Sequence, residues 1–139
     1  MGDSAPSLPA FHLFHKASQR ADNLFAETGV KLTPRQYIVL CVLERRDRAS
    51  QTHLVQQTGI DRSTMTEVVK RLVAQGYLRR RRSPSDARAY DVRLTDKGRE
   101  ALKSAHEAAE HAVKQLFQFL PANSRTRFLD ELRKLAGGG

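Results

Sequence analysis

The 139-residue chain has few of the features that stabilise very small or secreted proteins. Its single cysteine, Cys41, cannot form an internal disulfide, which agrees with a reducing compartment. No apolar run approaches the roughly 18 residues that a membrane-spanning helix needs. Residues 1–14 lack the basic and apolar regions of a signal peptide. We therefore expect a cytoplasmic protein that contacts no membrane and folds as a single domain over residues 1–139.

Signatures of catalysis are missing too. The sequence has no G-x-S-x-G, P-loop or H-E-x-x-H motif and no pair of cysteines at metal-binding spacing. Catalysis needs a nucleophile, a base or a metal set in a pocket, and no pattern here indicates one. We expect that the protein is not an enzyme and that it has no catalytic residue, no cofactor and no metal site.

Positive charge, by contrast, is abundant and concentrated. The chain has 24 Lys and Arg residues against 15 Asp and Glu residues, a formal net charge of +9. Residues 62–99 hold eleven of the basic and four of the acidic residues, so about a quarter of the chain carries +7. The segments before and after it are each only +1. A positive field of this density favours a polyanion as partner, with duplex DNA first.

Apolar residues recur at three- and four-residue steps in several segments, which predicts amphipathic helices. These segments cover residues 9–27, 34–43, 51–57 and 62–75, followed by a long segment after Thr95 and a short one after Pro121. The segment at 34–43 is apolar almost all round, which is typical of a central helix. We expect the last segment to bury Phe128, Leu129, Leu132 and Leu135.

Capping residues mark the start of three of these helices. Thr33 precedes a proline and can form a capping box with Gln36. Ser50 and Asp61 precede the two short segments that a glycine, Gly59, separates. Two short helices with a tight turn between them, the second with a small-polar and basic outer face, predict a helix-turn-helix.

A β-hairpin follows this pair. Residues 77–82 can extend as a strand, residues 83–87 have the composition of a turn, and residues 89–94 alternate between apolar and polar. The alternation places Tyr90, Val92 and Leu94 on one face. The sequence therefore predicts a mainly α fold with a small β-hairpin, or wing, directly after the helix-turn-helix.

The order of these elements and the motifs within them are those of a known family. The chain resembles the MarR family of winged-helix transcription regulators over residues 8–136. The motifs that carry the resemblance are LTPRQY at 32–37, TGIDRSTMT at 58–66, GYLRR at 76–80, SDAR at 85–88 and LTDKG at 94–98. The most specific part is D-x-R in the wing turn, followed by L-T-x-x-G at the start of the next helix.

The resemblance implies a homodimer on duplex DNA. Residues 8–28 and 100–136 would be the dimerisation helices, and residues 32–98 the winged helix-turn-helix that binds DNA. Two-fold symmetry then predicts a pseudo-palindromic operator. The sequence supports the dimer independently, because a lone chain would expose an apolar surface on its end helices. The residues expected on this surface are Phe11, Phe14, Leu116, Phe117 and Leu120.

The expected DNA contacts follow from the position of each residue on these elements. The start of the second helix of the pair should enter the major groove, and the start of the first should contact phosphates. The candidates on these helices are Ser50, Gln51, Arg62, Ser63, Thr64, Thr66 and Lys70. Thr64 has an alternative role, in which it caps the helix or faces inward.

In the wing, the resemblance implies that Arg88 enters the minor groove and that Asp86 orients it through a salt bridge. The alternative for Arg88 is a solvated turn arginine. The arginines at 79–82 should alternate along their strand, so about half can face DNA, and Arg80 is the candidate.

A small-molecule effector is the third expectation. In similar family members a pocket between the dimerisation helices and the winged helix takes phenolic or aromatic carboxylates. The residues here that suit such a ligand are Phe11, His12, His15, Arg20 and Tyr37. We therefore expect a repressor that a small aromatic acid releases from its operator.

Two other sensing modes stay open, together with a different partner. His12 and His15, three residues apart on one helix, can share a metal, although polar residues at the rim of an interface are the plainer interpretation. Cys41 can be a redox sensor, although its apolar surroundings favour an inert core thiol. A winged helix can also bind protein or RNA in place of DNA.

Overall fold

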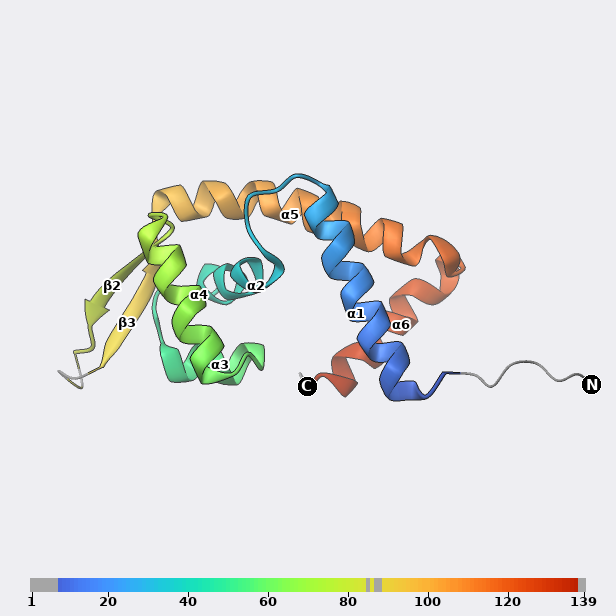
Figure 1. Cartoon of the computed structure of the whole chain (residues 1–139), viewed down its shortest axis with the longest axis horizontal. Helices are drawn as coiled ribbons and strands as arrows, with labels where there is room; N and C mark the ends of the chain where they lie inside the picture. Colours follow the sequence, from blue (N-terminus) through green and yellow to red (C-terminus); the bar gives the residue numbers. More distant parts are fainter. Residues whose placement is uncertain (1–7, 85, 87–88, 138–139) are drawn as a thin grey trace, which may run out of the picture.

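The computed structural model describes residues 8–84, 86 and 89–137. The molecule is elongated, with α1 (Ala10–Glu27) and α6 (Ala122–Leu135) at one end and the wing at the other (Figure 1). The long helix α5 (Asp96–Leu116) runs along the top of Figure 1 and connects the two ends. No helix in the described part of the chain is both long enough and apolar enough to cross a membrane.

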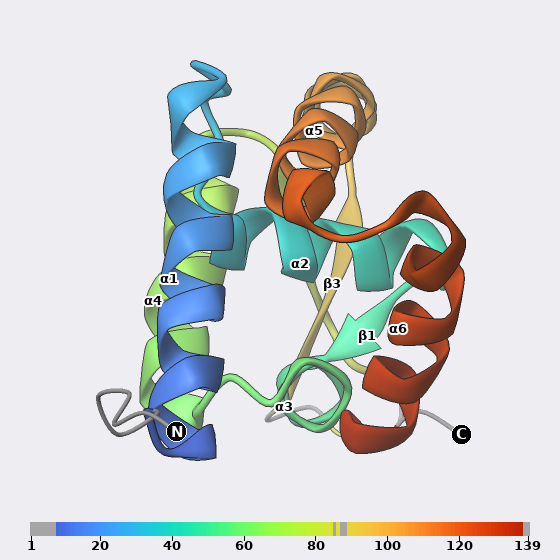
Figure 2. The ribbon, with the colours of Figure 1, turned by 90° about the vertical axis from the view of Figure 1, so that its right-hand side faces the viewer.

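The remaining helices lie beneath α5. They are α2 (Pro34–Glu44), α3 (Gln51–Thr58) and α4 (Arg62–Ala74), and a 3-10 turn, η1 (Phe117–Phe119), follows α5. Viewed end-on in Figure 2, α1 and α6 stand on opposite sides, and α2 is seen farther back, under α5 and on the wing side of both helices (Figure 1). The mainly helical fold with a small wing confirms the fold class that the sequence predicts.

The predicted caps are all present. Thr33 Oγ1 accepts a hydrogen bond from the Gln36 backbone N–H at 3.2 Å, and Gln36 Oε1 accepts one from the Thr33 N–H at 3.1 Å. Ser50 caps α3 and Asp61 caps α4. Gly59, between these helices, has φ 75°, a left-handed conformation that glycine adopts without steric cost.

The wing is part of a three-stranded antiparallel sheet, one strand more than the predicted hairpin. Strands β2 (Leu78–Arg82) and β3 (Tyr90–Leu94) form the hairpin, and β1 (Ala49–Ser50) pairs with the other edge of β3. The sequence gives no signal for β1, because a strand of two residues is too short to show any alternation. Its consequence is that the start of α3 is attached directly to the wing.

The core lies between α2, α4, α5 and the sheet. Leu40, Leu54, Met65, Leu72 and Leu102 are the largest of its fully buried side chains. The apolar periodicity in residues 62–75 is confirmed as a buried stripe of α4, which contains Met65, Val68, Val69 and Leu72. This core fixes α3, α4 and the wing as one unit.

The prediction that α6 buries its apolar residues is wrong for the single chain. Phe128, Leu132 and Leu135 are exposed, and α6 has no fully buried residue. The periodicity of α6 correctly marks an apolar face, but the chain itself offers no surface large enough to cover it. An amphipathic pattern identifies the face and not its partner.

One residue predicted to be exposed is buried instead. Phe117 is only 7% exposed because the chain turns after α5 and stacks this ring edge-on against Phe128, with 5.6 Å between centroids. Phe119, two residues later, is 77% exposed. Phe11 and Phe14, at the same end of the molecule, are 85% and 59% exposed. Leu116 and Leu120 are half-buried.

The junction of the wing and α5 requires a glycine at position 98. A Cβ on Gly98 would overlap the carbonyl oxygen of Tyr77 and lie 2.8 Å from Leu94 Cδ1. The neighbouring Thr95 hydroxyl donates to the Gly76 carbonyl at 2.6 Å and accepts from the Gly98 N–H at 3.0 Å. These contacts give a physical reason for the L-T-x-x-G motif at this position.

Gly98→Ala tests this junction. Alanine favours a helix over glycine by about 1 kcal/mol, but the clash with backbone and core is larger, so we expect a net destabilisation of roughly 1–3 kcal/mol in urea unfolding. Lys103→Ala, an exposed change on the same helix, should shift the free energy of unfolding by less than about 0.5 kcal/mol. A Gly98→Ala protein as stable as the parent would show that the junction relaxes freely.

Candidate nucleic-acid interface

The first turn of α4 is organised by Asp61. Its carboxylate accepts hydrogen bonds from the Thr64 N–H at 2.9 Å, the Ser63 hydroxyl at 2.9 Å and the Thr64 hydroxyl at 2.7 Å. These donors, with the Thr64 backbone N–H first, lower the pKa of Asp61 to about 2. Asp61 is therefore ionised at neutral pH, and the lone pairs of both hydroxyls stay available as acceptors.

The side chain of Thr64 is half-buried and lines a hollow between α1, α2 and α4. Its hydroxyl proton is held by Asp61. This geometry favours the alternative role for Thr64, as a member of the cap that faces inward. Ser63, one residue earlier, is exposed.

A set of hydrogen bonds braces the start of α3 against the start of α4. Gln51 Nε2 donates to Thr66 Oγ1 at 2.7 Å and to the Arg62 carbonyl at 3.3 Å. The Arg62 guanidinium donates back to Thr52 Oγ1 at 3.1 Å. Three of the residues expected to contact DNA, Gln51, Arg62 and Thr66, thus lie together in one network at the surface.

A hollow of about 420 Å³ separates this network from the wing. It is lined by Ser50, Gln51, Thr52, Leu54, Arg62, Val69, Arg80, Ala89, Tyr90 and Val92. Four of the candidates, Ser50, Gln51, Arg62 and Arg80, line it from four separate elements, β1, α3, α4 and β2. Basic and hydroxyl groups around a concave surface suit the sugar-phosphate backbone of a nucleic acid.

Sequence reasoning missed two polar residues of this hollow, Thr52 and Tyr90. Thr52 is exposed on α3, one residue after Gln51, and nothing in its local pattern distinguishes it. The alternation of its strand predicts Tyr90 on the apolar face, yet it is 52% exposed. It lies at the outer end of β3, where the core no longer covers the sheet.

The four arginines of β2 are all exposed, and they alternate between the two faces of the sheet. Arg80, opposite Val92 in the register, lines the hollow beside α3 and α4. Arg79, opposite Arg93, lines a different hollow next to the start of α5. The expectation that about half of this run faces the helix-turn-helix side therefore agrees with the strand geometry.

The remaining candidates lie along the same side of the molecule or in the wing turn. Lys70 is exposed on α4, two turns after Arg62. Asp86 is exposed, and its carbonyl accepts a hydrogen bond from the Ala89 N–H at 3.0 Å, which closes the turn. Arg88 lies outside the described residues.

The residues expected to bind a ligand are not gathered into one cavity of the single chain. Tyr37 lines an apolar cavity of about 180 Å³ between α1, α2 and α5. Arg20 lies elsewhere on α1, with its guanidinium 5.6 Å from the centroid of the Phe119 ring. Phe11, His12 and His15 are exposed near the start of α1.

Tyr37 instead takes part in a polar chain that connects α2 to α5. Its hydroxyl lies 2.8 Å from His106 Nδ1, and His106 Nε2 lies 2.9 Å from Glu44 Oε1. Burial is the main cause that raises the pKa of Tyr37, so the phenol is neutral at neutral pH. Sequence reasoning missed His106 and Glu44, because their contact joins residues 62 positions apart.

The structure offers no support for the metal and redox alternatives. No group of three or more His, Cys, Asp or Glu side chains suited to a metal ion occurs within residues 8–84, 86 and 89–137. Cys41 is half-buried in α2, and burial raises the pKa of its thiol, which keeps it protonated.

Comparison with known proteins agrees with this geometry. A sequence model of the MarR family matches residues 30–89. The chain superimposes on Bordetella bronchiseptica BpsR with a TM-score of 0.86 and 32% identity, over 97% of this chain and 98% of BpsR. The chain belongs to the MarR family of winged-helix transcription regulators. The resemblance that the motifs indicated is therefore confirmed.

Two further proteins show how far the similarity extends. The transcriptional repressor CouR, solved on a 23-mer DNA duplex, has a TM-score of 0.82 and 30% identity over 92% of each chain. YdgJ of Bacillus subtilis, an HTH-type transcriptional regulator, is 34% identical over 97 residues, which are 70% of this chain and 59% of YdgJ. Against three curated relatives, YdgJ among them, the chain spans about half of their length.

Proposed function

We propose that this protein is a sequence-specific DNA-binding transcription regulator that acts as a homodimeric repressor. The observation that carries the proposal is the convergence of Ser50, Gln51, Arg62 and Arg80, from β1, α3, α4 and β2, on one concave surface. Their positive and hydrogen-bonding groups suit phosphates and base edges. CouR, which has the same fold, is a repressor that was solved on duplex DNA.

In this proposal the exposed side of α4 enters the major groove. Its first two turns carry Arg62, Ser63 and Thr66, which meet base edges and phosphates. Lys70 lies further along the helix and meets a phosphate. Arg62 is free to exchange its hydrogen bond with Thr52 for a guanine or a phosphate, because both side chains are exposed. Ser50 and Gln51 contact phosphates from the start of α3.

The wing supplies the second set of contacts. Arg80 follows the backbone beside the hollow, and Arg88 enters the adjacent minor groove with Asp86 orienting it. The support for Arg88 is the D-x-R motif in the turn of a chain that belongs to the family. An arginine in a narrow minor groove responds to the negative potential there and hence to DNA shape.

Two separate substitutions, one of an arginine on each face of β2, test the proposal that the protein binds DNA. Arg80→Gln should lower the affinity for operator DNA about tenfold and reduce the salt slope by about one, because it removes a contact on the helix-turn-helix side. Arg81→Gln removes the same charge from the other face and should change the affinity less than about threefold. Fluorescence anisotropy across a salt series measures both. Equal losses would indicate that only net charge matters.

The dimer would form through α1 and the segment from η1 to α6. This end of the molecule exposes Phe11, Phe14, Phe119, Phe128 and Leu135. Exposed apolar groups in this number, on helices from both ends of the chain, are typical of a surface that a second copy covers. The described chain leaves each of the five at least 44% exposed.

The double substitution Phe11→Asp and Phe119→Asp should turn the dimer into a monomer at about 10 µM protein. Each change places a charge where the proposed interface is apolar, and an unpaired buried charge costs several kcal/mol. Sedimentation equilibrium measures the mass. Tyr90→Asp, an equally polar change at the far end of the molecule, should leave the dimer intact. A parent protein that sediments as a monomer would contradict the proposal directly.

The effector in this proposal is a small aromatic acid. The cavity between α1, α2 and α5 has an apolar lining that includes Phe25, Ala112 and Leu116, with Tyr37 at one side as a hydrogen-bonding group. In BpsR, DNA binding is regulated by 6-hydroxynicotinic acid, which has this chemistry. In the dimer, Phe11, His12, His15 and Arg20 would complete the site from the α1 side.

A panel of hydroxybenzoic and hydroxynicotinic acids should contain a member that raises the melting temperature and weakens operator binding at least about tenfold. Tyr37→Phe should reduce both effects, because it removes the phenolic hydroxyl and keeps the ring. Tyr77→Phe, remote from this cavity, serves as the control. Unchanged DNA affinity with every acid would contradict the effector and leave the DNA proposal standing.

A further inference from the structure

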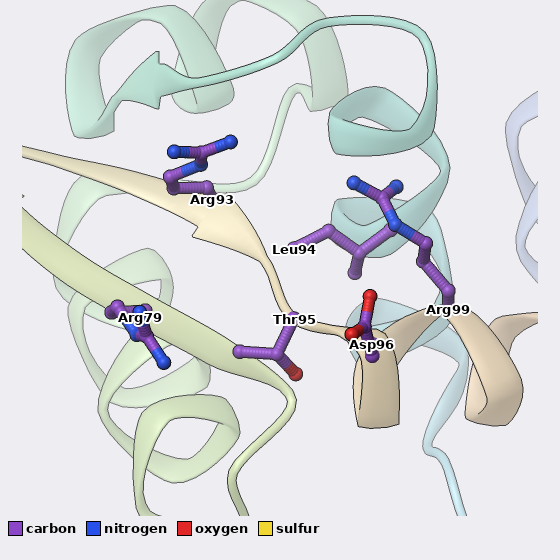
Figure 3. Close-up of a pocket in the computed structure, with 6 residues that line it drawn as sticks. All are labelled: Arg79, Arg93, Leu94, Thr95, Asp96 and Arg99. Atoms are coloured by element: carbon purple, nitrogen blue, oxygen red, sulfur yellow. The ribbon is translucent and has the colours of Figure 1, made fainter.

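A second basic hollow lies at the base of the wing, on the face of the sheet away from α3. It has a volume of about 250 Å³ and is lined by Arg79, Arg93, Leu94, Thr95, Asp96 and Arg99. Figure 3 shows arginines from β2, from β3 and from the first turn of α5 placed around Thr95 and Asp96. Three arginines against one aspartate leave this lining with two excess positive charges.

The register of the sheet brings two of these arginines into direct opposition. Arg79 lies opposite Arg93 in the pairing of β2 with β3. The next pair on the same face of the sheet, Arg81 with Asp91, has opposite charges. Like charges directly opposite each other on a sheet are destabilising. The strand pairing thus holds a repulsive pair beside the hollow, which an anion between the two side chains would relieve.

In the part of the chain that the structure describes, two of the three guanidinium groups have no ion pair with an acidic side chain. Arg93 makes an ion pair with Asp47 at 3.0 Å. Within the described ranges neither Arg79 nor Arg99 makes an ion pair, although Asp96 belongs to the same lining. Both side chains are exposed and hence able to bind a ligand from solution.

The ligand chemistry follows from these groups. A guanidinium presents its N–H donors as a planar fork that fits the oxygens of a phosphate in bidentate contacts. The hollow begins at the N-terminus of the 21-residue helix α5, whose dipole favours negative charge. Its volume equals that of several water molecules, at roughly 30 Å³ each, which leaves room for a phosphate-sized group.

We propose that this hollow is a binding site for a phosphate group, held by Arg79 and Arg99 with Arg93 at its edge. The group can belong to a small molecule or to the backbone of DNA, and the orientation of the site favours the small molecule. Arg79 and Arg80 are neighbours on one strand and point to opposite faces, so the helix-turn-helix surface and this hollow are on different sides of the sheet. The proposal does not depend on the function proposed above.

Titration of the intact, isotope-labelled protein with inorganic phosphate at constant ionic strength tests the site. Saturable NMR shifts should be confined to Arg79 and residues 93–99, with half-saturation on the order of 1 mM. Arg99→Gln and Arg79→Gln should each weaken this binding at least about fivefold. Both positions are exposed, so both variants should fold. Arg82→Gln, on the same strand but the other face, should bind phosphate within about twofold of the parent.

Two results would overturn the proposal. Shifts that grow linearly without saturation, or that are the same in Arg99→Gln as in the parent, would mean that the positive surface attracts ions without a site. In a separate arm, a duplex DNA added without phosphate should leave the Thr95 and Arg99 signals unchanged. DNA that shifts these signals and is displaced by phosphate would overturn the small-molecule assignment and make the group a backbone phosphate.

Discussion

The junction at Thr95 and Gly98 is the constraint on which the rest of the molecule depends. The hydroxyl of Thr95 joins the carbonyl that follows α4 to the first turn of α5, and the missing Cβ of Gly98 allows α5 to lie against Tyr77. Lys97 adds a hydrogen bond to the Gln75 carbonyl at 2.8 Å. The end of α4, both long strands and the start of α5 therefore meet at a single point. Since α5 continues to the other end of the molecule, this junction sets the orientation of the winged helix relative to α1 and α6 (Figure 1).

The sheet divides the positive charge of the wing between two surfaces. One face of β2 lies next to the starts of α3 and α4. Caps and hydrogen bonds between these helices hold the polar groups there in place. The other face joins the start of α5. Because successive strand residues point to opposite faces, a run of four arginines serves both surfaces without any change of backbone direction. The four arginines are consecutive in the sequence, yet the fold divides them between two surfaces.

Local chemistry explains which parts of the site sequence reasoning could find. Ser50 and Asp61 are caps, and capping depends on neighbours within three residues, so the starts of α3 and α4 follow from sequence. Arg62 and Gln51 occupy positions defined by those starts, and the structure brings them together. Thr52, Tyr90 and the chain from Tyr37 through His106 to Glu44 could not be found in this way. Their roles depend on contacts between residues far apart in sequence, for which one sequence has no signal.

By itself, the sequence determined the helices, the hairpin, the caps and the concentration of charge, because periodicity, capping and turn chemistry act over a few residues. The tertiary structure decided which face of each element is covered. It buried Phe117 against Phe128 and left Phe119 and the apolar face of α6 open, and it added β1 to the wing. It also separated Arg79 from Arg80. These outcomes depend on packing between elements that are distant in the chain. Such packing is determined only in the complete fold, where all elements share one close-packed core.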